Sequence, residues 1–176
     1  MTRVLLGVVA LSVGATVIQS SVLSAFLAPQ AVPQMVLLVV VAAGLVRDAH
    51  TGMVAGFTAG LLLDLVPPAD HSAGRWALAL LLSGLVAGKV RESAFQVRPL
   101  LAVITVGVCS FVASGSYILA GVAIGEAAPL DISHLLLGVV VDILWAPLVV
   151  PWVMGLLGRI AGPRKPAAFV TGATGP

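Results

Sequence analysis

The chain has 176 residues, of which 60% are hydrophobic and only 9% are charged, and its formal net charge is +2. Soluble globular domains carry about 25% charged residues. A chain with a mean hydropathy of +1.15 needs lipid around most of its surface, so we predict an integral membrane protein. The small net charge, without a basic run interleaved with aromatic residues, gives no indication of nucleic-acid binding.

Six apolar runs follow one another along the chain and predict an all-α bundle of about six transmembrane helices. In chain order they are roughly Val4–Leu27, Val32–Val46, Thr51–Val66, Trp76–Val90, Leu100–Gly125 and Ser133–Leu157. A helix that crosses a bilayer needs about 20 apolar residues, so the second, third and fourth runs are short. We expect them to extend into their flanks or to lie where the bilayer is thinned.

Lysine and arginine are distributed unevenly between the two ends of the predicted helices. With the amino terminus inside, eight of the nine basic residues fall on the inner side, and Arg75 falls on the outer side. The eight are Arg3, Arg47, Lys89, Arg91, Arg98, Arg159, Arg164 and Lys165. Because basic residues concentrate in cytoplasmic loops, we predict that both termini are cytoplasmic.

The composition changes once, near the carboxyl end. Residues 1–161 are predicted to form a polytopic transmembrane helical domain, and residues 162–176 a flexible cytoplasmic tail, because the tail is rich in Pro, Gly and Ala. The longest connection between apolar runs, Pro67–Arg75, has nine residues. We therefore expect the function to lie within the membrane or at its edges.

The third apolar run carries small residues at a helical spacing. Gly52, Gly56 and Gly60 are each four residues apart, and Asp64 continues the series. Residues four apart share one face of a helix, and small residues on such a face let two helices approach closely in a membrane. The stripe is predicted to be a helix-packing or partner-contact face that turns the Asp64 carboxylate away from lipid.

The sixth apolar run repeats this arrangement with Gly138, Asp142 and Ala146 on one face, followed by Pro147. A charged side chain facing lipid at the membrane centre costs about 2.5–3.5 kcal/mol or more. We therefore predict that Asp142 is protonated, or hydrogen-bonded to a polar group on a neighbouring helix. Gly138 and Asp142 join the third-helix stripe as predicted packing or partner-contact residues.

Three interpretations of the two membrane aspartates stay open at this point. They could be the acids of an intramembrane aspartyl protease, although both follow three aliphatic residues rather than a Gly-x-Gly signature. They could relay protons or cations in a transporter. They could also be structural, fixing helix register by hydrogen bonds or contacting the transmembrane helix of a partner, and this is the interpretation we favour.

Other polar residues offer no recognisable catalytic, metal or cofactor site. His50, His71 and His134 lie at boundaries on both sides of the membrane, and no paired Cys/His motif or phosphate-binding glycine loop is present. We predict no enzyme activity, no cofactor and no bound metal. Gln19 and Gln34, in the first two helices, are predicted to hydrogen-bond between helices.

One stretch, residues 33–74, combines several features in a fixed order. They begin with Pro33, an apolar run to Val46, and Arg47. The motif GMVAGFTAGLLLDL follows, and its last part contains Gly60, Asp64 and Leu65. A short Pro-rich loop and Gly74 complete the order. This order resembles the core segment of the rod shape-determining protein MreD family. In that family, aspartate commonly follows the proline, whereas Gln34 stands here. The resemblance covers residues 30–90 by motif and the remainder by topology.

The resemblance implies a multi-pass protein of the bacterial inner membrane with a role in cell shape and peptidoglycan synthesis. It implies a non-catalytic scaffold that binds the transmembrane helix of MreC, together with RodA and a class B penicillin-binding protein, and is linked indirectly to MreB. The fold is also similar to the substrate-binding subunits of energy-coupling-factor vitamin transporters. A vitamin-transporter subunit is therefore the alternative function.

Overall fold

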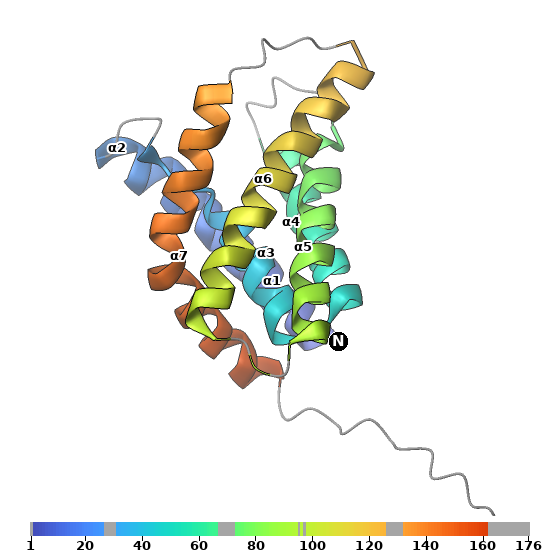
Figure 1. Cartoon of the computed structure of the whole chain (residues 1–176), viewed down its shortest axis with the longest axis vertical. Coiled ribbons are helices and arrows are strands. Elements are labelled where there is room, and N and C mark those ends of the chain that lie inside the picture. The colour runs from blue at the N-terminus through green and yellow to red at the C-terminus, as the bar shows by residue number, and fades with distance from the viewer. Residues whose placement is uncertain are drawn as a thin grey trace, which may run out of the picture.

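The computed structural model describes residues 2–26, 31–66, 73–94, 96, 98–125 and 132–161. Within these ranges the chain forms helices and no strand (Figure 1), which confirms the predicted all-helical fold. The elements are α1 (Thr2–Val17), a π-helical turn η1 (Ile18–Leu23), α2 (Ser24–Phe26), α3 (Met35–Val46), α4 (Ala49–Leu65), α5 (Arg75–Ser93), α6 (Pro99–Ala123) and α7 (Ile132–Ala161). The predicted tail, residues 162–176, lies outside the described residues.

Since α1, η1 and α2 follow one another without a break, the described residues form six helical segments, one for each predicted apolar run. Three stretches are long and apolar enough to cross a membrane: Arg3–Ser21, Pro99–Ala123 and Ile132–Ile160. The other three segments do not reach that length or composition. α3 has 12 residues, which at about 1.5 Å per residue span less than the hydrocarbon core.

The shortest of the six segments, α3, lies at the centre of the bundle. All residues from Val36 to Leu45 are buried, and the helix packs against α1, α4, α5, α6 and α7. A helix that is apolar on all sides is stable only when other helices surround it. Its sequence, MVLLVVVAAGLV, therefore defines the core of the bundle.

The start of α4 is capped from two directions. The Asp48 side chain accepts a hydrogen bond from the backbone nitrogen of Thr51 at 2.8 Å. Glu92, near the end of α5, accepts from the backbone nitrogen of Ala49 at 2.9 Å. These carboxylates satisfy two of the N–H groups that a helix leaves unpaired at its start, and they join the end of α5 to the start of α4.

This same end of the bundle collects the basic residues. The second turn of α1 lies beside the last turns of α7, where Gly7 faces Leu157 and Ile160. The described members of the basic set, apart from Arg75, lie at or next to the helix ends on this side: Arg3, Arg47, Lys89, Arg91, Arg98 and Arg159. Arg75 begins α5 at the other end, whereas Arg164 and Lys165 lie outside the described residues.

The outer faces of α6 and α7 are covered with large apolar side chains. On α6 these are Leu100, Ile104, Val108, Phe111, Leu119 and Val122, and on α7 they are Leu136, Leu137, Val140, Leu144, Leu148 and Trp152. Most recur at intervals of three or four residues, which places them along one face of each helix. Such faces require lipid or the helices of another protein around them.

Candidate functional site

The closest packing in the described bundle joins α4 to α5. A Cβ atom added to Gly52, Gly56 or Gly60 would collide with a backbone carbonyl oxygen of α5, which belongs to Gly84, Leu80 and Trp76 respectively. The two backbones therefore touch along three successive turns. The predicted stripe packs within the chain, so its glycines are not available to the helix of another protein.

Sequence analysis missed the partner side of this contact. Gly84 and Gly88, four residues apart on α5, face Gly52 and Ala49, and an added Cβ atom at either would also collide with backbone. A Cβ atom added to Gly44 on α3 would lie 2.9 Å from the backbone nitrogen of Gly88. The signal was available, because Gly84 and Gly88 show the same spacing of small residues as α4.

Asp64, near the end of α4, connects this helix to the start of α5. Its side chain is 3% exposed, and its two oxygens accept hydrogen bonds from the backbone nitrogens of Gly74 at 2.8 Å, Trp76 at 3.1 Å and Ala77 at 3.0 Å. These N–H groups belong to the first turn of α5, where a negative charge also interacts favourably with the helix dipole. Asp64 therefore serves as the cap of the next helix.

Arg75 lies next to this cap and packs against α6. Its guanidinium Cζ lies 3.9 Å from the centre of the Tyr117 ring, and its Nε and Nη2 donate to the Tyr117 backbone oxygen at 3.3 and 3.1 Å. The Trp76 and Tyr117 rings are also in contact, with centroids 4.7 Å apart. An added Cβ atom at Gly121 would collide with the guanidinium, so glycine makes room for Arg75.

The second membrane aspartate, Asp142, links three helices. It is fully buried. Its Oδ2 accepts from the Ser110 hydroxyl on α6 at 2.6 Å, and its Oδ1 accepts from the backbone nitrogen of Gln34, just before α3, at 2.7 Å. Gly138 differs from the glycines of α4, because a Cβ atom added there would meet nothing within 4 Å. Contact between Gly138 and a partner protein stays a prediction.

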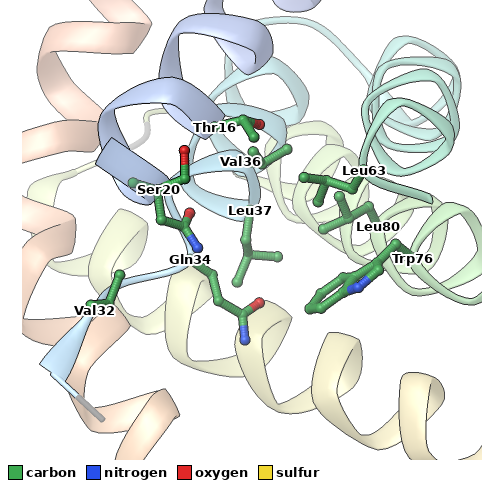
Figure 2. A pocket seen from close by; sticks show the side chains of 10 residues that line it. Thr16, Ser20, Val32, Gln34, Val36, Leu37, Leu63, Trp76 and Leu80 are labelled. Carbon is green, nitrogen blue, oxygen red and sulfur yellow. The ribbon is translucent and has the colours of Figure 1, made fainter. Parts of the chain in front are cut away.

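Two cavities lie at the end of the bundle that contains Asp64 and Asp142. The first, of about 480 Å³, is bounded by α1, η1, α3, α4 and α5 (Figure 2). Its polar lining residues are Thr16, Gln19, Ser20 and Gln34. The second, of about 340 Å³, is bounded by α6 and α7. Gln34 and Trp76 line both.

The two glutamines behave differently. Gln19 accepts a hydrogen bond from the backbone nitrogen of Met35 at 3.0 Å, which agrees with the predicted bond between helices. The Gln34 side chain departs from that prediction: its Oε1 is buried and has no hydrogen-bond partner among the described residues. Gln34 instead contributes its backbone N–H to Asp142.

Groups that could hold a metal ion are not found in the described ranges, where no three His, Cys, Asp or Glu residues cluster. His50 and His134 lie on helices at opposite ends of the bundle, and His71 falls outside the described residues. Both buried aspartates accept hydrogen bonds from backbone N–H groups outside their own helices. Their carboxylates therefore join helices together.

Comparison with known protein families agrees with the resemblance read from the motifs. Residues 1–160 match the family described as rod shape-determining protein MreD. The chain belongs to the MreD family. This membership gives it a role in rod shape determination, in a family of cell-shape membrane proteins. With several candidate membrane-crossing helices, this MreD-family chain is a multi-pass membrane protein. No curated protein and no solved structure matches it.

Proposed function

We propose that this MreD-family chain is a non-catalytic membrane scaffold of the bacterial cell-elongation complex. It acts in the control of cell shape and peptidoglycan synthesis by binding the transmembrane helix of MreC, and it contacts RodA and a class B penicillin-binding protein, with MreB linked indirectly. All six helical segments cross the inner membrane in this proposal.

The observation that carries the proposal is the use of the two buried carboxylates. Asp64 accepts three backbone N–H groups at the start of α5, and Asp142 accepts one N–H and one hydroxyl from two other helices. A transport relay or an aspartyl protease needs carboxyl groups that face a substrate or exchange protons along a path. Carboxylates that hold helix ends in place suit a scaffold with one rigid arrangement.

In this proposal, partners bind to surfaces that the packing within the chain leaves exposed. The space beside the glycines of α4 and α5 is occupied by the backbone of the facing helix. The glycine faces of this helix pair therefore do not form a docking groove for another protein. The apolar faces of α6 and α7 remain exposed, and Gly115 and Gly138 on these helices have open space above them. Since helices associate in membranes through small residues and shape, we expect the MreC helix to pack on this side.

Both termini are cytoplasmic in the proposed orientation. Six described basic residues gather at the end where α1 begins and α7 ends, and a single one, Arg75, lies at the opposite end. Basic residues are retained on the cytoplasmic side, so this end faces the cytoplasm. Asp64, Asp142 and both cavities then lie toward the outer side.

Purification in a mild detergent, followed by identification of the proteins that elute with the chain, tests the scaffold directly. The proposal expects MreC, and with it RodA and a penicillin-binding protein. Recovery of an ATPase pair with a coupling subunit would instead support the energy-coupling-factor transporter alternative. A Gly138→Leu variant should lose MreC if the α7 face is the contact, whereas Gly155→Leu, a second open glycine nearer the inner end of α7, provides a matched control.

A further inference from the structure

The first cavity arises because α1 leaves the bundle as it rises from its first residues. α1 packs against α3, α4 and α7, whereas η1 and α2, which continue it, make no more than sparse contact with the other described helices, and Figure 1 shows α2 at the edge of the bundle. At Ile18 the helix changes to a π-helical turn, a feature that is rare and often accompanies functional sites. A space of about 480 Å³ opens between this part of the chain and α3, α4 and α5.

The lining of this space is divided into two parts. Leu37, Leu63 and Leu80 form an apolar part, and Thr16, Ser20 and Gln34 form a polar part (Figure 2). Gln19 is a further polar lining residue. Among the described residues that line the two cavities sharing Gln34 and Trp76, none is Asp, Glu, Lys or Arg. The part of a ligand that lies between these described walls therefore presents a long apolar portion and an uncharged polar portion.

Two hydrogen-bonding groups near the cavity have no partner among the described residues, and one of them, the Gln34 Oε1, has no exposed surface toward it. The Gln34 Oε1 is buried without a partner in the described chain, and an unpaired buried acceptor of this kind costs about 1–3 kcal/mol. The Trp76 indole N–H, on the same cavity wall, likewise donates to no described residue, whereas the Trp76 backbone nitrogen donates to Asp64. The Trp76 indole N–H is thus a donor without a described partner beside a space large enough for a small ligand.

We propose that this cavity binds one membrane phospholipid. An acyl chain lies against Leu37, Leu63 and Leu80, and the uncharged glycerol and ester groups reach Gln34 and Trp76. Ester oxygens accept from the indole N–H. The position agrees with this occupant, because Trp76 is the second residue of α5, and tryptophan lies at the ester level of the bilayer in membrane proteins.

Tryptophan fluorescence offers a direct test. The chain has three tryptophans, so Trp145→Phe together with Trp152→Phe leaves Trp76 as the one reporter. Phospholipid brominated on its acyl chain is added to this protein in detergent micelles. Bound lipid should quench Trp76 in a saturable manner at equimolar lipid. Thr16→Phe fills the cavity and should weaken this binding by about tenfold or more.

The matched control is Val17→Phe, which adds the same ring at the next residue of α1, on an exposed side chain that lines neither cavity. It should leave saturable quenching unchanged. Native mass spectrometry of the unaltered chain, which does not depend on how the variants fold, should show one retained phospholipid. Quenching that rises only in proportion to bulk lipid, with no retained lipid mass, would overturn the proposal and leave the cavity to water or to a partner's segment. Recovery of MreC is measured separately and is not decided by this result.

Discussion

Asp142 on α7 accepts a hydrogen bond from the backbone nitrogen of Gln34, 108 positions earlier in the chain, at 2.7 Å. The second oxygen of the carboxylate accepts from Ser110 on α6 at 2.6 Å. One side chain, itself fully buried, therefore holds the start of the central helix against two others.

Removing this carboxylate should destabilise the bundle. Asp142→Leu leaves the Gln34 N–H and the Ser110 hydroxyl unpaired, each at a cost of about 1–3 kcal/mol. Asp142→Asn should be much milder, because its amide oxygen accepts from Gln34 and its amide N–H donates to Ser110. Thermal unfolding in detergent measures how much stability each of the two variants loses. Equal losses for Asn and Leu would show that the bonds described here do not decide stability.

The α4–α5 contact leads to a second prediction, at the level of one methyl group. Gly56→Ala places a Cβ atom against the backbone of Leu80, so the helices must separate, and the unfolding temperature should fall. Gly115→Ala, in the interior of α6, meets nothing within 4 Å. It should be neutral or stabilising by about 0.5–1 kcal/mol, because alanine favours helix more than glycine does. The same loss from both would contradict backbone contact at Gly56.

These two sites show how far the sequence leads. The spacing of Gly52, Gly56 and Gly60 predicts a packing face, and Asp64 follows from the same periodicity because the face that buries the glycines also buries the carboxylate. The apolar runs likewise predict every helical segment. Local spacing is enough in both cases, because the property depends on one helix.

What the carboxylates bind depends on other helices, and the sequence did not reveal it. Arg75 is an evident charged neighbour for Asp64, yet its guanidinium packs on Tyr117, and Asp64 accepts backbone N–H groups that every residue carries. Ser110 lies 32 positions from Asp142 and has no motif to mark it. The π-helical turn and the cavity beside it depend on how α1 leaves the bundle, which composition does not encode.

The proposed orientation predicts the chemical accessibility of two exposed positions. In a Cys109→Ser background, which removes the one native cysteine, Ala73→Cys lies at the start of α5 and Ser93→Cys at its end. An impermeant maleimide should label Ala73→Cys in intact spheroplasts and Ser93→Cys only after lysis. The reverse pattern would overturn the cytoplasmic placement of the termini.

The central claim is that the buried carboxylates are structural elements of a scaffold, and Asp64 tests it most directly. Asp64→Asn keeps one oxygen that can accept from Gly74 and Ala77, and it loses the bond to Trp76. Asp64→Leu loses all three and leaves the first turn of α5 uncapped, at a cost of about 0.5–2 kcal/mol or more.

The decisive measurement is cell shape in a rod-shaped bacterium that lacks its own MreD-family gene and expresses each variant, with membrane levels measured by immunoblot. We predict that Asp64→Asn restores most of the rod shape given by the unaltered chain and that Asp64→Leu does not. An Asp64→Asn protein that is present at normal levels and yet leaves the cells round would contradict the account, because a charge or a titrating proton would then be required.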